Sequence, residues 1–363
     1  MAFKLLICLG SDAWIWSELR FKRIYQCSGY FWSCQPFFQI FFGEVKNPFP
    51  EGNLSYVKSR ANPTSLRKLP LFVQMRALPP LILLDPILQN WLLEDIGRGD
   101  RTTQGLWEAP DKIVQAEWTA KAGGVIAGLP IAKRIFQLLS DQTSFVAVVA
   151  EGEDCHPGQV IARLHGSLDT LLMGERVALN LAMHLSGIST LTRKYADQLA
   201  DLPTQLVDTR KTTPGLRLLE KYATQVGGAI NHRFGLDDAV MIKDNHIVAA
   251  GSIKDAIARI REQMPYPLRI EVETETLEQV TEALEQGADI IMLDNMPLER
   301  MRQAVHKIRG KNDRLKIEAS GNITLDTIRA VAQTGVDYIS TSAPITRSTW
   351  LDLSMNLLDE NRI

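Results

Sequence analysis

The chain of 363 residues has few cysteines, little net charge and no long apolar run. Its four cysteines form no CxxC pair and no zinc-ligand spacing, so they indicate reduced thiols of an intracellular protein. A net charge of -2 gives the whole chain no affinity for nucleic acid or for a membrane surface, and no apolar stretch is long enough to cross a bilayer. The motifs of P-loop and Rossmann cofactor sites are also missing, which disfavours both classes.

Residues 1–74 differ from the rest of the chain in composition. They hold three of the four cysteines and few acids, and aromatic residues are dense between positions 31 and 42. Their apolar residues keep no sustained period that is typical of a strand or a helix. Two interpretations stay open: a poorly ordered extension, with Met75 as the natural first residue, or a transit peptide that directs the chain to an organelle. Without a transit peptide we expect a cytoplasmic protein.

Residues 75–185 combine helical and strand-like patterns. Helices are predicted at Leu81–Leu93, Ile131–Leu139 and Leu171–Leu199, the last being one long helix or two that join near Gly187. Strands are predicted at Lys112–Lys121, Phe145–Glu151 and Val160–His165. This region therefore predicts a mixed α and β domain.

From about Leu206 the chain alternates β-branched runs with helical runs. The apolar runs are QLVDTR, AVMIKDN, RIEVETE, DIIMLDN, KIEAS and DYISTS. Helices are predicted between them at Ile253–Ile260, Leu277–Gln286, Leu298–Ile308 and Ile323–Thr334. This spacing is typical of a parallel sheet with crossover helices. It favours a (β/α) barrel over an open doubly wound sheet, although the pattern does not reveal strand order.

Polar residues stand at the end of each of these predicted strands. They are Asp208–Lys211, Lys243–Asn245, Glu271 and Glu273, Asp294 with Asn295, Ser320–Asn322 and Thr341–Ala343. In a (β/α) barrel the carboxyl ends of the strands converge on one face, where the chemistry takes place. At any one strand, such polar residues could simply begin an ordinary solvated loop. Because all six strands end in polar residues, the pattern favours a single functional ring.

The ring divides by charge. Its cations are Arg210, Lys211, Arg217, Lys221, His232, Arg233 and Lys243. In a net-acidic chain this cluster predicts a polyanionic ligand, since arginine forks suit planar carboxylates. A lone histidine is more often structural than catalytic, but beside Arg233 and after Gly227-Gly228 His232 is equally consistent with either role.

An acidic group stands opposite the cations. Glu271 and Glu273 are two apart, so a strand places both on the same face, near Asp294 of the next unit. Carboxylates of this kind bind magnesium together with substrate phosphates. We expect Glu271 to pair only with Lys243 or with an arginine.

Ser320-Gly321-Asn322 follows a predicted strand and leads into a helix that begins near Thr324. Main-chain N–H groups at such a helix N-terminus favour a phosphate. The next strand end, Thr341–Ala343, completes the pair of last βα loops in which many barrels bind phosphate.

Several motifs, in this order, resemble the quinolinate phosphoribosyltransferases (nicotinate-nucleotide pyrophosphorylases, carboxylating). They are EDIGRGD at 94–100, DTRKTTPG at 208–215, NHR at 231–233, KDNH at 243–246 and EASG at 318–321. The resemblance runs from about Met75 to the C-terminus. It implies an α+β sandwich domain at 75–185, an incomplete (β/α) barrel at 186–345, and a C-terminal segment, 346–363, that returns to the first domain. It also implies a homodimer with shared active sites.

The family reaction transfers phosphoribosyl from 5-phosphoribosyl-1-diphosphate to quinolinate with loss of carbon dioxide, in de novo NAD biosynthesis, with Mg2+. By resemblance, Arg176 reaches the partner's site, and Arg210, His232, Arg233 and Lys243 hold the quinolinate carboxylates. Thr209 is a further substrate-binding residue. Lys211 lies near the diphosphate, and Glu273 and Asp294 bind the ribose and magnesium. Lys211, Lys243, Glu273 and Asp294 are the expected catalytic residues.

The 5-phosphate is expected at Ser320, Gly321 and Asn322 and at Thr341, Ser342 and Ala343. Ser342 stands where the family usually has glycine, and Pro344 follows, which puts the geometry of that loop in doubt.

Three other functions stay open. Lys243 at a strand end could form a Schiff base, although the surrounding charges should keep it protonated. A related pyridine or molybdate-linked pyrophosphorylase would share the fold but need fewer cations. A non-catalytic phosphate-binding barrel is the third.

Overall fold

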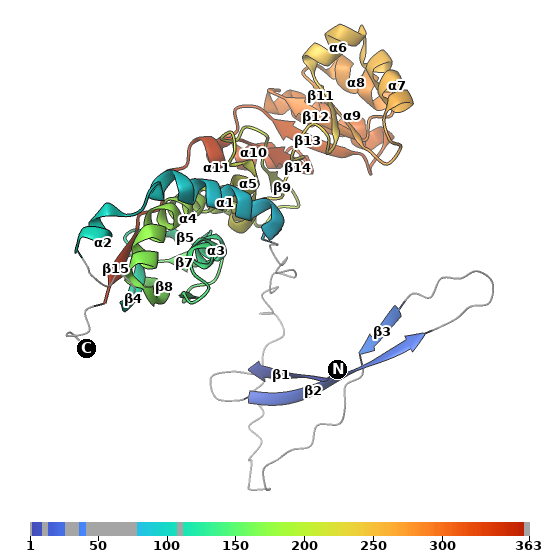
Figure 1. Cartoon of the computed structure of the whole chain (residues 1–363). Helices are drawn as coiled ribbons and strands as arrows, with labels where there is room; N and C mark the ends of the chain where they lie inside the picture. The colour runs from blue at the N-terminus through green and yellow to red at the C-terminus, as the bar shows by residue number, and fades with distance from the viewer. Residues whose placement is uncertain (1, 9–13, 26–35, 41–77, 107–111, 359–363) are drawn as a thin grey trace, which may run out of the picture. The chain divides into compact units, whose positions relative to one another are not determined.

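The computed structural model describes residues 2–8, 14–25, 36–40, 78–106 and 112–358 (Figure 1). The chain divides into two units, residues 1–71 and 72–363, which are described separately. Among the described residues, no helix combines the length and the apolar character that crossing a membrane requires.

In the first unit the structure describes three strands, where the sequence predicted no regular element. They are β1 (Ala2–Cys8), β2 (Trp14–Tyr25) and β3 (Pro36–Ile40), and β2 pairs antiparallel with both of the others. The aromatic and β-branched residues of these stretches favour extended backbone. The rest of the segment that was predicted to be a poorly ordered extension lies outside the residues that the structure describes.

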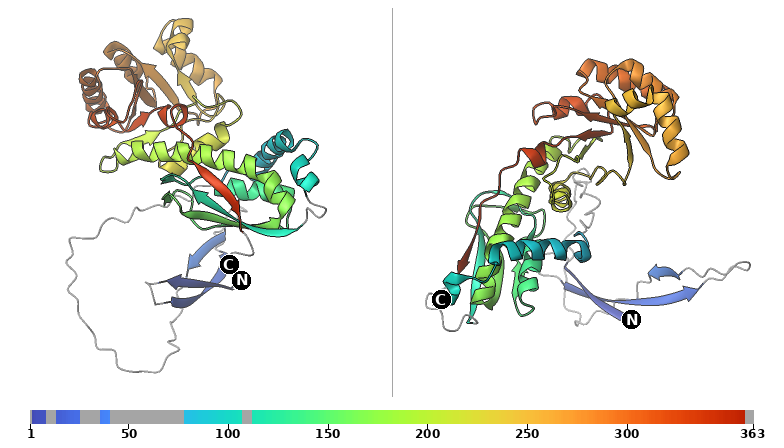
Figure 2. Two further views of the ribbon diagram at one scale, coloured as in Figure 1. Left: turned by 90° about the vertical axis from the view of Figure 1, so that its left-hand side faces the viewer. Right: turned by 45° about the horizontal axis from the view of Figure 1, so that its top comes forward.

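The first part of the second unit contains an antiparallel sheet covered by helices. The sheet has the order β15-β4-β8-β6, formed by Leu353–Leu357, Ile113–Ala120, Val160–Ser167 and Ser144–Ala147. The helices are α1 (Leu81–Ile96), α2 (Arg101–Leu106), α3 (Leu129–Leu139) and α4 (Leu168–Asp197), and a small ribbon pairs β5 (Gly124–Val125) with β7 (Asp154–Cys155). Strand β15 comes from the end of the chain and pairs with β4, so the C-terminal segment lies beside this domain (Figure 2).

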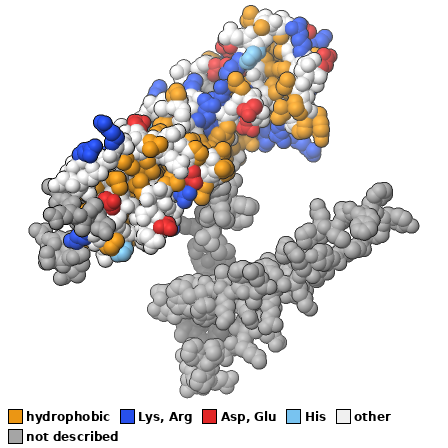
Figure 3. Space-filling view, viewed as in Figure 1, with side chains coloured by type: hydrophobic (Ala, Val, Ile, Leu, Met, Phe, Trp, Pro, Cys, Tyr) orange, Lys and Arg blue, Asp and Glu red, His pale blue; other side chains and the backbone are white. Residues whose placement is uncertain are grey.

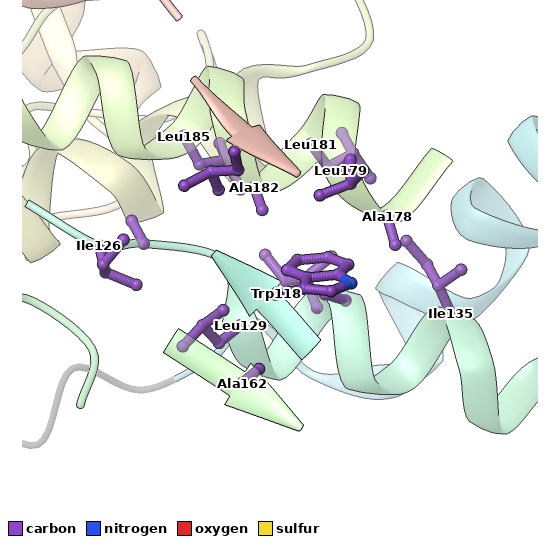
Figure 4. Packing of buried hydrophobic residues seen from close by; sticks show 14 of the residues in the cluster. Trp118, Ile126, Leu129, Ile135, Ala162, Ala178, Leu179, Leu181, Ala182 and Leu185 are labelled. Atoms are coloured by element: carbon purple, nitrogen blue, oxygen red, sulfur yellow. The ribbon is translucent and has the colours of Figure 1, made fainter. Parts of the chain in front are cut away.

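The core of this domain forms around Trp118 of β4. Its indole is fully buried and makes edge contacts with Phe136 and Phe145. Figure 4 shows the indole beneath the side chains that α4 presents, among them Leu179 and Leu181. Burial of these large apolar side chains, at about 25 cal/mol per Å² of apolar surface, is the main force that holds α4 on the sheet.

The sequence predicted either one long helix or two helices that join near Gly187, and the structure shows that α4 is one continuous helix. Gly187 is not a break. A Cβ atom built there would lie 2.1 Å from the carbonyl oxygen of Thr349, so the glycine lets the returning chain approach the helix. Gly227 of α5 (Arg217–Gly227) has a similar role, because its Cβ would clash with Thr192 of α4.

The second part contains six parallel strands in the order β10-β11-β12-β13-β14-β9. They are β9 (Gln205–Val207), β10 (Val240–Ile242), β11 (Ile270–Thr274), β12 (Ile290–Asp294), β13 (Lys316–Ser320) and β14 (Tyr338–Ser340). A parallel bridge from Val207 to Ile230 adds a seventh element beside β9. Because the last strand pairs with the first, the sheet curves into the predicted barrel. Among the described residues no ladder joins Ile230 to β10, so the barrel is incomplete.

Helices cover the outside of these strands (Figure 1). They are α6 (Asp244–Ala250), α7 (Ile253–Gln263), α8 (Leu277–Glu285), α9 (Leu298–Lys311) and α10 (Ile328–Ala332). The short helix α11 (Ala343–Thr346) packs against α4 and α5. Helix α10 is shorter than predicted. Thr324 to Thr327 form a turn in which the Thr324 N–H bonds the Thr327 hydroxyl, and the helix begins only at Ile328. The expectation that the Ser320–Asn322 turn leads directly into a helix N-terminus is therefore wrong.

Candidate active site

A cavity of about 510 Å³ opens at the carboxyl ends of the barrel strands. It is lined by Thr209, Arg210, Lys211, His232, Arg233, Met241, Lys243, Glu273, Met292, Asp294, Asn295, Ser320, Gly321, Asn322 and Ser340. Seven separate segments of the sequence contribute to it. Five of the six predicted polar strand ends therefore meet at one site, although Asp208, Asp244, Asn245 and Glu271 do not line it.

A second cavity, of about 210 Å³, adjoins the first. Thr341, Ser342 and Ala343 line it together with Arg347. It shares Thr209, Lys211 and the Ser320–Asn322 turn with the larger cavity, so the two lie side by side and are together called the basin. Arg347 was missed in the sequence, since it follows a helix of four residues and lies outside every motif.

Arg176 lies elsewhere, on α4 of the N-terminal domain. Its side chain is largely exposed, and its ion-pair partner is the adjacent Glu175 at 3.6 Å. It does not line either cavity of this chain. Its expected role in a partner's site stays a prediction.

Asp208 holds the two main cationic segments of the site in place. Its buried carboxylate accepts hydrogen bonds from the main-chain N–H of His232 at 2.8 Å and from Asn231 at 2.6 Å. It also accepts from Thr224 and pairs with Lys221 of α5. The segment after β9 is thus fixed beside the segment that carries His232.

Two of the predicted cations do not face the basin, which corrects the sequence analysis. Lys221 is fully buried and neutralises Asp208. Arg217 donates to the Thr212 hydroxyl and to the carbonyl oxygen of Phe234, so it braces the loop. Both lie on α5, one helical turn apart and therefore on the same face of the helix.

Arg210 and Arg233 both line the cavity and lie near each other. Burial and the nearby Arg210 guanidinium lower the pKa of Arg233. The Nε atom of Arg210 is buried and has no hydrogen-bond partner among the described residues. Two neighbouring guanidinium groups, one of them with an unused donor, would be stabilised by an anion with several oxygens.

The acidic side of the cavity contains Glu273 and Asp294. Glu273 pairs with Lys243, and Asp294 accepts a hydrogen bond from the Asn295 amide at 2.8 Å. Glu271 was expected to pair with Lys243 or with an arginine, and this is wrong. Its carboxylate is buried in the barrel interior, where it lies 3.1 Å from Nε2 of His232. Both glutamates do point to the same face, as their spacing predicted.

His232 is surrounded by acidic groups. Burial alone would lower its pKa, but Glu271 and Glu318 outweigh burial, so the pKa of His232 is raised. Glu318 of β13 was not predicted, although it stands two residues before Ser320 on the same face of the strand.

The turn after β13 depends on a glycine. Gly321 has a φ of +95°, and a Cβ there would lie 2.2 Å from the side-chain oxygen of Asn295. That oxygen accepts a hydrogen bond from the Asn322 amide at 3.0 Å. This hydrogen bond links the ends of β12 and β13 beside the basin. Figure 3 shows acidic and basic side chains next to one another on the visible face of the barrel.

Known proteins resemble both parts of the second unit. The family described as quinolinate phosphoribosyl transferase, C-terminal domain, matches residues 188–356, and its N-terminal domain matches residues 100–186. A probable nicotinate-nucleotide pyrophosphorylase (carboxylating) of Synechocystis is 59% identical over 284 residues, covering 78% of this chain and 96% of that protein. The corresponding protein of Bacillus subtilis is 46% identical over 278 residues, covering 77% and 94%.

A solved structure shares the whole fold of this unit. The crystal structure of NadC from Streptococcus pyogenes is 41% identical, with a TM-score of 0.73, and covers 77% of this chain and 99% of that one. Both family domains match in order, and the relatives align over nearly their full length. The chain therefore belongs to the quinolinate phosphoribosyltransferase family.

Proposed function

We propose that the basin joins quinolinate to 5-phosphoribosyl-1-diphosphate and releases carbon dioxide and diphosphate, giving nicotinate mononucleotide for NAD biosynthesis. The observation that carries the proposal is the convergence of Arg210, Arg233 and Lys243 with Glu273 and Asp294 in one cavity of a chain of this family. A dicarboxylate and a sugar diphosphate require such a division of charge.

The cationic part of the cavity suits quinolinate. Its two neighbouring carboxylates can accept from Arg210 and Arg233, whose guanidinium donors are directed in a planar fork. Lys243 adds a point charge. Since Lys243 is already paired with Glu273, the charge that it offers to a ligand is partly balanced.

Glu273 and Asp294 fit magnesium by the chemistry of their donors. Both are carboxylates on adjacent parallel strands, and both line the same cavity. Magnesium is commonly bound by one or two carboxylates together with substrate phosphates. When bound there, it would supply positive charge against the diphosphate. Glu273 would then have to exchange part of its contact with Lys243 for the metal.

The smaller cavity suits the 5-phosphate. The Ser320–Asn322 turn and Thr341–Ala343 offer main-chain N–H groups and hydroxyls, and Arg347 adds a cation. The Ala343 N–H already bonds the Thr341 hydroxyl at 3.2 Å, so that hydroxyl is oriented by its own loop.

The residues of the site then act mainly by position and charge. The pyridine nitrogen attacks the anomeric carbon as diphosphate leaves, and Lys211 stabilises the departing negative charge. Glu273 and Asp294 stabilise the positive charge that develops on the sugar. When the adjacent carboxylate leaves as carbon dioxide, the electron pair stays on the ring carbon, where the positive charge of the neighbouring nitrogen stabilises it. A proton from solvent then adds to that carbon and gives nicotinate mononucleotide. Holding two anionic substrates in register contributes much of the acceleration.

We further propose a homodimer in which Arg176 completes the partner's site. The exposed guanidinium on α4 and the absence of Arg176 from the cavities of its own chain support this. Most soluble oligomers of this kind have twofold symmetry, so each copy would give and receive one arginine.

The decisive experiment is the release of carbon dioxide from carboxyl-labelled quinolinate in the presence of the diphosphate donor and magnesium. We expect labelled carbon dioxide and nicotinate mononucleotide in equal amounts. Nicotinate in place of quinolinate is the control and should give little product. Turnover of nicotinate at the same rate, or no magnesium-dependent release from quinolinate, would exclude the proposal.

A further inference from the structure

Three side chains meet inside the barrel beneath the substrate cavity. His232 follows the bridge at Ile230, Glu271 lies on β11 and Glu318 lies on β13. Nε2 of His232 is 3.1 Å from the Glu271 carboxylate and 3.7 Å from that of Glu318. One donor atom of each residue lies within 4.8 Å of the others. The proposed reaction gives no role to either glutamate.

These ligand types would suit a divalent metal, but the histidine tautomer opposes one. Nδ1 of His232 accepts the main-chain N–H of Arg233 at 2.7 Å. A main-chain N–H can only donate, so Nδ1 carries no proton and the ring proton is on Nε2. A protonated Nε2 donates to Glu271 and cannot coordinate a metal. A second ring proton would have to displace the Arg233 N–H.

One histidine can balance the charge of at most one of the two buried carboxylates. Glu271 and Glu318 are each 4% exposed, and one oxygen of each lacks a hydrogen-bond partner among the described residues. Ionised carboxylates buried in this way are costly, and the usual response is that one of them takes up a proton.

Glu318 is the carboxyl group better placed to hold that proton. Burial, and then the Glu271 carboxylate, raise the pKa of Glu318 to about 7. Glu271 makes the closer contact with Nε2 of His232, at 3.1 Å against 3.7 Å for Glu318. The groups that face Glu318 from other elements are Glu271, His232, Ser340 and Lys243. Lys316 on the same strand pairs with Asp337.

We propose that Glu318 is a positioning residue, an uncharged carboxylic acid that lets Glu271 alone orient His232 beneath the bound dicarboxylate. The neutral state matters because a second negative charge under the cavity would repel a dianionic substrate. This inference rests on the proposed binding of quinolinate at Arg210 and Arg233.

The test compares the wild-type enzyme with Glu318→Gln, which copies the shape of the uncharged acid. We expect the quinolinate KM of the wild type to rise severalfold from about pH 6 to about pH 8, as Glu318 ionises. The KM of E318Q should stay nearly flat, with kcat changed less than KM. Titration of the substrates, and of groups that both proteins share, changes both KM values alike. The ratio of the two KM values at each pH therefore reports on Glu318 alone.

A constant ratio across that range would overturn the proposal, as would an E318Q enzyme whose KM is high at every pH. Stoichiometric zinc or manganese in the wild type that is lost in E318Q would overturn it as well. If E318Q does not fold, the wild type alone decides. Infrared spectroscopy should show a buried protonated carboxyl at about pH 6 that disappears by about pH 8. Lack of that band overturns the proposal, whereas absence of any wild-type turnover would refute the proposed function instead.

Discussion

The carboxylate of Asp208 accepts the main-chain N–H of His232 at 2.8 Å, and this bond joins the two cationic segments of the active site. Asp208 directly precedes Thr209, Arg210 and Lys211, which line the cavity from one side. Its charge is balanced by Lys221, which is fully buried. The position of the substrate-facing side chains thus depends on an ion pair that does not itself face the substrate.

Replacing Asp208 should destabilise the whole domain. Asp208→Ala leaves Lys221 buried without its counter-charge, and loss of one partner of a buried pair costs about 3–5 kcal/mol. Urea unfolding of the full chain measures the change. Asp201→Asn is a matched control, because it removes an exposed pair with Arg329 and should change stability little. Equal effects of the two substitutions would contradict the role given to Asp208.

Arg176→Ala should abolish turnover and leave the unfolding midpoint unchanged, since the side chain is exposed and makes no buried contact. The shared site predicts complementation. Mixing R176A with Lys243→Ala subunits should restore about a quarter of wild-type turnover, because half of the dimers are mixed and each then has one intact site. A mixture without any recovered activity would argue against a shared site.

A chain that begins at Met75 should be folded and fully active. The family matches begin at residue 100, and the Synechocystis relative covers 78% of this chain. Carbon dioxide release and thermal unfolding of the shortened and full-length proteins provide the comparison. Loss of activity or solubility on shortening would show that residues 1–74 contribute to the enzyme.

Lowering the pH should weaken the hydrogen bond by which the Glu220 carboxylate holds the main-chain N–H of Thr213. Burial alone would raise the pKa of Glu220, but hydrogen bonds from His184 and Thr213 outweigh it and lower the pKa. A lowered pKa means that ionised Glu220 stabilises the fold above its ordinary pKa, and that this contribution is lost as pH falls through the folded value. The difference in unfolding free energy between wild type and Glu220→Gln should therefore shrink below about pH 4. A difference that grows on acidification would refute this.

Much of the site could be predicted from spacing alone. Glu271 and Glu273 share a face because strands alternate, and the polar strand ends converge because parallel strands in a barrel end on one rim. The sequence did not reveal the direction of each cation. Lys221 and Lys243 look alike in the cationic run, yet one is fully buried against Asp208 and the other lines the cavity.

The local pattern of apolar and polar residues was enough to determine the barrel strands and most of its helices, because periodicity reports which face of an element is buried. Only the tertiary structure decided that α4 is continuous past Gly187, that α10 begins at Ile328, and that Arg347 joins the phosphate end of the basin. It also decided that Glu271 pairs with His232. These outcomes depend on contacts between residues far apart in the chain, where close packing and the cost of buried charge select one partner among several that the sequence allows.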